Sequence, residues 1–258
     1  MPHTIAITGK GGVGKTTVAA LTVTRLIARG RSPVLAVDAD PNNCLDAALG
    51  VRVSSTLGGV REQAREIAGK GPGAGIPKQD LLNLRIAESL VEARHFDLIA
   101  MGRPEGPGCY CYANNVLRQA LEQMTQQYPH IVIDNEAGLE NLSRRIVRRV
   151  QLLVMVGDPS KRGIETVGRL YDLAREMEVA YDRLAIVINR LRRNEFPEGA
   201  ADLKERTKAD HLVGLPESDA LLDLAERGDG LDRIPGSDPV VENLDRFLDE
   251  AVLGRNGA

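Results

Sequence analysis

The stretch GKGGVGKTT, Gly9–Thr17, decides the fold of this chain. It fits the pattern G-x-x-x-x-G-K-[ST], it follows a short apolar run, Ile5–Thr8, and it precedes a segment with helical periodicity, Thr16–Arg29. Glycines let the backbone curl until its amide groups point at phosphate oxygens, and the N-terminus of the next helix adds the positive end of its dipole. A strand, a glycine-rich loop and a helix in this order predict a phosphate-binding loop.

Beyond this loop, short apolar runs alternate with helical patterns. The expected further strands are Pro33–Asp38, Phe96–Met101, Ile131–Asp134, Leu152–Val156, Leu184–Ile188 and, with a weaker pattern, His211–Gly214. The expected further helices are Val116–Gln127, Ile164–Met177, Ala220–Glu226 and Val240–Val252. Because such alternation builds βαβ units, we predict an α/β fold of the three-layer P-loop NTPase type, with a mostly parallel sheet covered by helices on both faces. We expect a single domain over residues 1–258.

Composition narrows the classes of partner. The net charge of −3 gives no electrostatic reason to expect nucleic acid, and no apolar run has the length that spans a bilayer. The polar face of Val240–Val252 is acidic, whereas a membrane-surface helix favours Lys and Arg, so we expect this helix to dock on the domain. The first strand pattern begins at once and the 3 cysteines are too few for a disulfide framework, so we expect a cytoplasmic protein.

The phosphate loop assigns roles to individual side chains. Lys15 would place a positive charge between the β- and γ-phosphates, and the hydroxyl of Thr16 would ligate Mg²⁺. The residues of the loop predicted to bind the nucleotide are Gly9, Gly11, Gly12, Val13, Gly14, Lys15, Thr16 and Thr17.

Acidic residues follow two of the predicted strands. Val37–Asn43 reads VDADPNN and carries Asp38 and Asp40, whereas the strand IVID ends in Asp134 and is followed by NEAG. A lone Asp at the end of a strand is commonly a cap or a turn residue. Two such sites together with a phosphate loop favour a magnesium site instead, because ligands of open α/β sheets bind at the carboxyl ends of the strands.

The variant of the phosphate loop carries a resemblance. KGGVGKTT, with its extra Lys10, resembles the deviant Walker A motif of the superfamily that contains partition ATPases, division-site ATPases and the nitrogenase iron protein. The resemblance implies a face-to-face homodimer in which Lys10 reaches the nucleotide of the facing subunit. It also implies that Asp38 acts near Mg²⁺, that Asp40 orients the attacking water and that Asp134 holds a Mg²⁺-bound water.

The same resemblance suggests where the base binds. Asn189, at the end of the strand AIVI, would read the adenine edge, and Pro216 would belong to the loop of the base pocket. The alternatives are a turn residue for Asn189 and a rigid loop for Pro216. ATP is favoured over GTP by the superfamily and by the absence of a guanine-type Asn-Lys-x-Asp motif.

Two cysteines one residue apart form the second informative motif. Residues 101–115 read MGRPEGPGCYCYANN, which places Cys109 and Cys111 on a loop rich in Gly and Pro. Thiolates suit Zn²⁺ and softer metals, but one pair supplies only two of the four ligands of a closed tetrahedral site. A two-fold dimer would supply all four and would place the metal on its axis. Two unrelated buried cysteines or a redox pair are the alternatives.

The run GRPEGPGCYCY, together with VDADPNN before it and DNEAG after it, is similar to the CooC family of accessory ATPases. The resemblance implies an ATP-hydrolysing metallochaperone that inserts nickel into apo carbon monoxide dehydrogenase, or into the related acetyl-CoA synthase. It implies that Cys109 and Cys111 bind Ni²⁺ or Zn²⁺ between the subunits. The alternatives are a partition or positioning ATPase and an iron–sulfur reductase like the nitrogenase iron protein, although NEAG lacks the second cluster cysteine expected there.

Two features outside these motifs complete the expectations. Cys44 follows the first acidic motif, and we expect it to be a small buried apolar residue. The basic stripe Arg144, Arg145, Arg148 and Arg149 is expected to be a solvated helix face, with a docking surface for the partner enzyme as the alternative.

Overall fold

The computed structural model describes residues 2–42, 44–58, 83–84, 86–103, 109–139, 142, 146–147, 149–193 and 195–254. For residues 109–113 and 125 it describes the backbone alone. Arg144, Arg145 and Arg148 of the basic stripe lie outside the described residues, whereas Arg149 pairs with Asp182.

One sheet of eight strands runs through the described residues in the order β3-β4-β2-β5-β1-β6-β7-β8. All neighbouring pairs are parallel except β3 and β4, which are antiparallel. The strands are β1 (His3–Gly9), β2 (Val34–Ala39), β3 (Leu90–Glu92), β4 (Phe96–Ala100), β5 (His130–Asn135), β6 (Val150–Gly157), β7 (Tyr181–Leu191) and β8 (His211–Pro216). The predicted strands are confirmed, and β3 is the edge strand that the sequence pattern missed.

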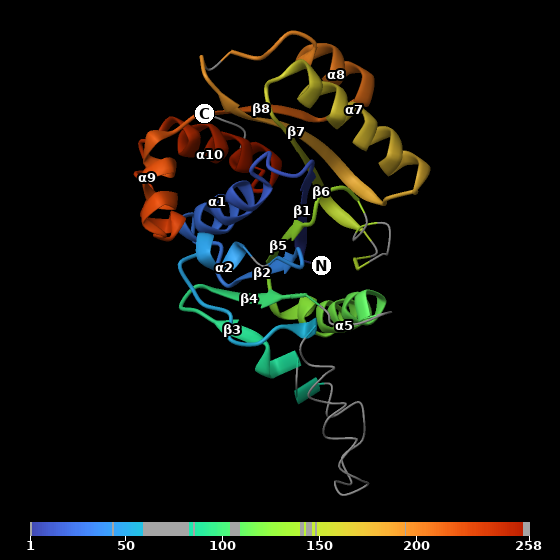
Figure 1. The fold of residues 1–258 in the computed structure, drawn as a ribbon, viewed down its shortest axis with the longest axis vertical. Helices are drawn as coiled ribbons and strands as arrows, with labels where there is room; N and C mark the ends of the chain where they lie inside the picture. Colours follow the sequence, from blue (N-terminus) through green and yellow to red (C-terminus); the bar gives the residue numbers. More distant parts are fainter. Residues whose placement is uncertain are drawn as a thin grey trace, which may run out of the picture.

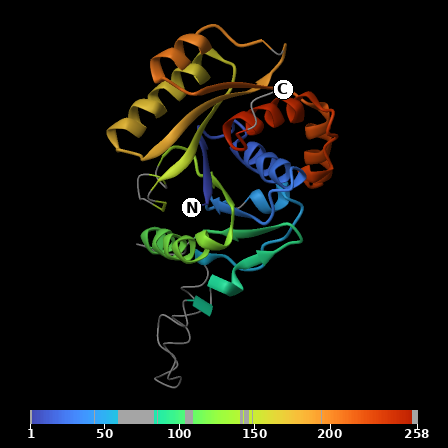
Figure 2. The same cartoon turned by 180° about the vertical axis from the view of Figure 1, so that it is seen from behind.

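Helices cover both faces of this sheet, as predicted (Figures 1 and 2). The α-helices are α1 (Lys15–Ala28), α2 (Leu45–Ala48), α5 (Cys109–Met124), α7 (Lys161–Glu176), α8 (Ala200–Thr207), α9 (Asp219–Arg227) and α10 (Pro239–Ala251). Among the described residues, the short 3₁₀ helices are η1 (Thr125–Gln127) and η2 (Leu231–Arg233). Helices α1, α2, α9 and α10 pack on one face, and α5, α7 and α8 pack on the other.

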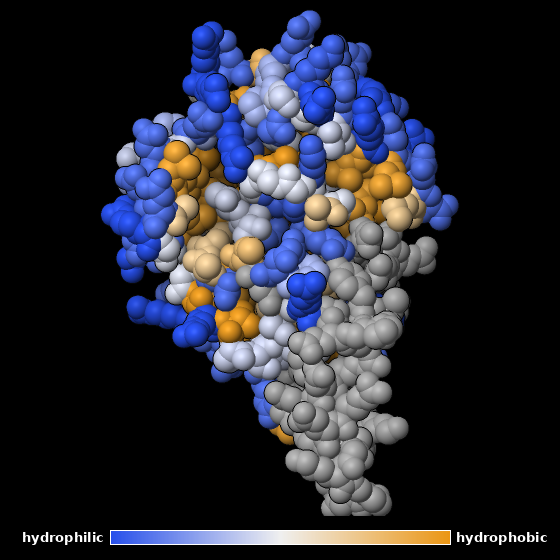
Figure 3. All heavy atoms as spheres, viewed as in Figure 1, coloured by the Kyte–Doolittle hydropathy of each residue, from blue (hydrophilic) through white to orange (hydrophobic). Residues whose placement is uncertain are grey.

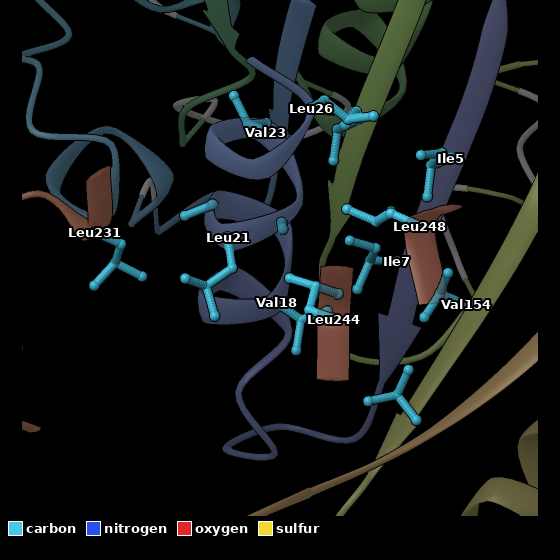
Figure 4. Close-up of a cluster of buried hydrophobic side chains, with 14 of the residues drawn as sticks. Ile5, Ile7, Val18, Leu21, Val23, Leu26, Val154, Leu231, Leu244 and Leu248 are labelled. Atoms are coloured by element: carbon cyan, nitrogen blue, oxygen red, sulfur yellow. The ribbon is translucent and has the colours of Figure 1, made fainter. Parts of the chain in front are cut away.

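Successive side chains of the central strands point alternately into the two hydrophobic cores, one on each face of the sheet. On β7, Ala185 and Val187 join the core beneath α1 and α10, whereas Leu184, Ile186 and Ile188 join the core beneath α7 and α8. Figure 4 shows the first of these cores, in which side chains of α1 interdigitate with those of the strands and of α10. Strands buried on both faces need continuous apolar runs, and this is the pattern that identified them.

The last helix docks on the domain, as expected. Val241, Leu244 and Leu248 of α10 are fully buried against α1 and the sheet. Its acidic face is not simply solvated, because Asp245 and Asp249 pair with Arg25 of α1 and with Arg29, the residue that follows this helix.

The described surface is mixed in character. Figure 3 shows mainly hydrophilic side chains on this face, interrupted by separate apolar patches. The large apolar side chains that are exposed among the described residues are Leu84, Leu173, Met177, Phe196 and Leu222. Within the described part of the chain, no helix is both long and apolar enough to cross a membrane.

Candidate nucleotide site and the cysteine helix

The phosphate loop joins β1 to α1 at the carboxyl edge of the sheet. Gly14 takes a positive φ of 92°, which L side chains rarely adopt, and a Cβ there would clash with the amide of Asn189. Gly12 has a φ of 81° with open space around it, so its need for glycine is conformational alone. The loop therefore has the shape that the sequence predicted, and its glycines are required for two different reasons.

The N-terminus of α1 has no side-chain cap. Gly14 occupies the capping position and supplies no side-chain hydrogen bond. The N-termini of α7, α9 and α10 are capped instead by Ser160, Ser218 and Asp238, each of which accepts a hydrogen bond from a backbone N–H of the first turn. Because uncapped N–H groups need an acceptor, the first turn of α1 is suited to an anionic ligand.

Lys15 lies over this loop and not in solvent. Its side chain is buried, and its Nζ donates to the carbonyl oxygen of Lys10 at 3.3 Å. A buried ammonium with a single long hydrogen bond can exchange this contact for a stronger one with phosphate.

Asp38 and Asp134 stand side by side at the ends of adjacent strands. They are register partners in the β2–β5 pair, and each is only 1% exposed. Burial raises the pKa of Asp134 to about 7, with the charge of Asp38 acting in the same direction and a hydrogen bond from Thr16 opposing it. Burial also raises the pKa of Asp38 to about 6. Two buried carboxyl groups this close favour a cation between or beside them.

The two carboxyl groups differ in how their oxygens are used. Asp38 accepts hydrogen bonds from the backbone N–H of Leu45 at 3.0 Å and of Asp40 at 3.1 Å, so it shapes the first switch, Val37–Asn42. Oδ1 of Asp134 is buried and has no hydrogen-bond partner. An orphaned carboxylate oxygen beside a threonine hydroxyl is a donor set that fits a hydrated Mg²⁺.

The second switch, Asn135–Gly138, is tied to the phosphate loop by its backbone. The N–H of Gly138 donates to the carbonyl of Gly9 at 3.2 Å, and the hydroxyl of Thr8 donates to the carbonyl of Gly138. Asn135 also donates from Nδ2 to the carbonyl of Ile7 at 3.0 Å. The sequence analysis missed Thr8, whose only signal is a polar residue at the buried end of an apolar strand.

Asn189 and Pro216 come together at the ends of neighbouring strands. Asn189 pairs in register with Leu215, directly before Pro216. Nδ2 of Asn189 donates to the carbonyl of Val13 at 2.9 Å, so this side chain braces the phosphate loop in addition to any contact with the base. The predicted adenine contact of Asn189 and the base-pocket role of Pro216 stay predictions.

Lys10 has a neighbour that the sequence analysis also missed. Lys10 and Asp158 line the same small cavity beside α7. Although burial acts in the opposite direction, hydrogen bonds from Ser160 and the charge of Lys10 hold the pKa of Asp158 below its ordinary value. Asp158 follows the end of β6, and the rule that found Asp38 and Asp134 at strand ends would have found it as well.

The expectation for Cys44 was wrong. Cys44 is exposed, because the residues before it belong to the first switch and only from Leu45 onward does the chain turn into the core. Partial desolvation of its thiol and the nearby charges of Asp38 and Asp40 raise the pKa of Cys44. Asp40 itself accepts hydrogen bonds from Asn42.

The cysteine pair lies in a helix. The backbone of Cys109 and Cys111 forms the first turn of α5, which begins seven residues before the predicted helix, whereas the sequence placed both on a loop. The side chains of these two residues and the whole of residues 104–108 lie outside the described part of the chain. Because α5 leads from β4 back to the start of the parallel strand β5, its first turn lies at the carboxyl edge of the sheet.

Residues 4–231 match the family described as the CobQ/CobB/MinD/ParA nucleotide binding domain. The chain belongs to this family. Its members are ATP-hydrolysing P-loop enzymes, and the chain is accordingly an ATPase, with ATP and Mg²⁺ as the nucleotide and ion that the family uses.

Curated relatives match between about two thirds and nearly all of the chain. An uncharacterised ATP-binding protein of Methanocaldococcus jannaschii is 36% identical over 96% of this chain and 98% of its own length. The carbon monoxide dehydrogenase accessory protein CooC of Rhodospirillum rubrum is 34% identical over 68% of this chain and 70% of its own length. The septum site-determining protein MinD of Thermotoga maritima is 25% identical over 88% of this chain and 80% of its own length.

Solved structures agree on the fold. The MinD cell division protein of Aquifex aeolicus matches with a TM-score of 0.71 at 20% identity, over 100% of this chain and 99% of that one. The MinD protein of Pyrococcus horikoshii, solved with Mg-ADP, matches with a TM-score of 0.67 at 19% identity over the full length of both chains. At this level of identity the likeness supports the P-loop fold and nothing finer.

Proposed function

We propose that this ATPase is a nickel metallochaperone that works as an ATP-switched homodimer and delivers its metal to apo carbon monoxide dehydrogenase. Cys109 and Cys111 would hold Ni²⁺ or Zn²⁺ between the two subunits. The likeness to CooC of Rhodospirillum rubrum supports the target enzyme.

One observation carries the proposal. The Cys-x-Cys pair starts a helix at the carboxyl edge of the sheet, where the phosphate loop and both switches also lie. The N–H of Met101, at the exit of β4 that leads toward the cysteines, donates to the carbonyl of Asp38 at 2.8 Å. A movement of the first switch on nucleotide binding or hydrolysis would therefore reach Met101, where the segment that carries the cysteines begins.

The hydrolysis step follows from the residues of the site. The uncapped first turn of α1 and Lys15 would bind the phosphates, and Asp40 would orient the attacking water. Thr16 and Asp134 would hold a hydrated Mg²⁺, which would neutralise charge on the transferred phosphoryl group. Its binding would also remove the repulsion between the two buried carboxyl groups.

The dimer depends on Lys10. In a single chain this lysine lies beside Asp158, whose carboxylate attracts its ammonium group and so competes with phosphate for it. Two chains that meet through their nucleotide edges would let each Lys10 exchange Asp158 for the phosphates across the interface. Loss of the γ-phosphate after hydrolysis would weaken this contact and relax the dimer.

The helical backbone constrains the metal site. Positions i and i+2 of a helix lie on different faces, so both cysteines of one chain can share an ion only if the first turn of α5 opens. If the nucleotide state decides whether this turn opens, it would thereby control the affinity for the metal.

The test measures metal content and oligomeric state of anaerobically purified protein, with and without a non-hydrolysable ATP analogue. We expect one Ni²⁺ or Zn²⁺ per two chains. The double variant Cys109→Ser, Cys111→Ser should lose both the metal and the metal-induced dimer. Cys44→Ser is the matched control, because it removes the third cysteine of the chain and should change neither quantity.

Three outcomes would change the proposal. Equal metal binding by wild type and double variant would remove the cysteines from the function and favour a positioning ATPase, consistent with the MinD relatives. A brown protein with visible absorption would favour an iron–sulfur reductase. If metal binds as expected but apo carbon monoxide dehydrogenase gains no activity on mixing with nickel and ATP, the target enzyme is wrong and the metal site stands.

A further inference from the structure

The strongest unexplained feature of the described residues is the side chain of Asn114. It is only 5% exposed, and its Nδ2 and Oδ1 are both buried without a hydrogen-bond partner. A buried amide with neither atom paired destabilises a fold, so native proteins rarely keep one without a reason. Asn115, the next residue, is exposed and has no such cost.

The position of Asn114 in α5 places it at the nucleotide edge. Asn114 shares a helix face with Leu117 and Leu121, three and seven residues later, and those leucines pack into the core formed with β2, β4 and β5. Helix α5 runs antiparallel to these strands, because it leads from the end of β4 back to the start of β5. It lies on the face opposite to α1 (Figures 1 and 2). Asn114 therefore lies one turn closer than Leu117 to the strand ends, where both switches begin.

The same helix carries the proposed metal ligands. Cys111 precedes Asn114 by three residues, close to one helical turn, and Cys109 begins the helix. The backbone of the second switch holds Gly138 against Gly9 through the hydrogen bond between their N–H and carbonyl groups. A switch that moves when ATP binds can present backbone groups to an amide that is unpaired beforehand.

We infer that Asn114 is a positioning residue that couples the second switch to the first turn of α5. Its unpaired amide pairs with the backbone of Asn135–Gly138 when ATP binds, and this pairing fixes the turn that carries Cys109 and Cys111. The effect of this coupling on metal binding by the cysteines rests on the proposed function. The coupling between the second switch and α5 does not.

The experiment compares hydrogen–deuterium exchange of the α5 backbone with and without a non-hydrolysable ATP analogue and Mg²⁺. Wild type should show slower exchange at residues 109–113 when the analogue is bound. Asn114→Leu keeps the branched shape of the side chain and removes the amide, so it should lose about fivefold of this protection, the change expected from one hydrogen bond. Asn115→Leu is the matched control and should behave like wild type.

Two further measurements, the melting temperature and the Zn²⁺ affinity, distinguish coupling from a structural role of Asn114. The nucleotide-free Asn114→Leu protein should melt at the same temperature as wild type or higher, because an unpaired amide has been removed. Its Zn²⁺ affinity without nucleotide should stay within about threefold of wild type, whereas the effect of the analogue on that affinity should shrink about fivefold. Asn114→Ala serves as a second variant if leucine prevents folding.

The outcomes distinguish this inference from the proposed function. Unchanged analogue-dependent protection in both Asn114 variants, or loss of folding in both, would overturn the inference. If wild type binds no Zn²⁺ through its cysteines yet its protection depends on Asn114, the metallochaperone proposal fails and the coupling stands.

Discussion

The two ends of α1 differ in how far their polar and charged groups are paired within the protein. At its C-terminal end, Arg25 and Arg29 each donate two hydrogen bonds to a carboxylate of α10, Asp245 and Asp249 respectively, at 2.8–3.1 Å. At its N-terminal end, Gly14 provides no cap and the nearest buried charge, Lys15, has one long hydrogen bond to a carbonyl. One helix thus has a satisfied end and an unsatisfied end.

This difference separates stability from function within one element. The C-terminal end is complete without a ligand, so its residues should affect folding and leave catalysis unchanged. The N-terminal end faces two buried carboxyl groups whose pKa values are raised to about 6 and about 7, an arrangement that disfavours the folded chain until a cation binds. Substitutions at the two ends should therefore have different signatures.

The largest effect is expected from Asp134→Asn. The amide keeps the shape of the side chain but removes a buried charge whose Oδ1 has no partner. We expect ATP hydrolysis at saturating Mg·ATP to fall roughly 10²-fold or more, while the nucleotide-free protein gains about 1 kcal/mol of unfolding free energy at pH 8. Phosphate release and urea denaturation measure the two quantities. A variant that loses both activity and stability would show that Asp134 is structural.

A smaller effect is expected from two glycines that flank the same helix. Gly14→Ala forces a side chain into a φ of 92° and against Asn189, whereas Gly30→Ala meets a φ of 72° with nothing within 4 Å. The strained backbone should cost about 1 kcal/mol of stability in each variant, and the contact with Asn189 should make Gly14→Ala the less stable of the two. Only Gly14→Ala should weaken ATP binding, by about tenfold or more. Calorimetric titration with ATP measures the affinities. Equal affinities would contradict the assignment of the loop.

The fold was readable from the sequence because its strands are buried on both faces. Runs such as Leu152–Val156 are apolar throughout, and each is followed by a helical pattern, so the element order predicted the architecture. The edge strand β3 escaped, because Leu90–Glu92 is short and half-exposed and has no period to detect. The start of α5 escaped because nothing in CYCYANN signals a helix cap.

The site was only partly readable for a different reason. Motif spacing identified Lys15, Asp38 and Asp134, since their neighbours along the chain define them. The contact of Asn189 with the phosphate loop joins residues 176 positions apart, and no local pattern contains it. The exposure of Cys44 likewise depends on how the first switch leaves the sheet.

His130, at the amino edge of the sheet near the C-terminal end of α1, should make the protein less stable in acid. Burial, with the nearby His3 and Arg31, lowers the pKa of His130 from 6.5 to about 4. The unfolded chain therefore binds a proton that the folded chain refuses, so stability is lost as the pH falls from about 6.5 toward 4. Urea denaturation at pH 7 and pH 5 should differ by about 1–2 kcal/mol from this residue. His130→Gln should reduce the difference, and the exposed His95→Gln should not.

The smallest effect is expected from the ion pairs that complete the satisfied end. Arg25 and Asp245 are only 19% and 17% exposed, so solvent screens their attraction less than it screens an exposed pair. A double-mutant cycle of Arg25→Ala and Asp245→Ala should give a coupling of about 1 kcal/mol in urea denaturation, with ATP hydrolysis unchanged. The exposed pair Arg169 and Glu165 on α7 should give a coupling near zero. If Arg25→Ala also slows hydrolysis, the two ends of α1 are not independent, and the helix transmits changes from its docking on α10 to the phosphate loop.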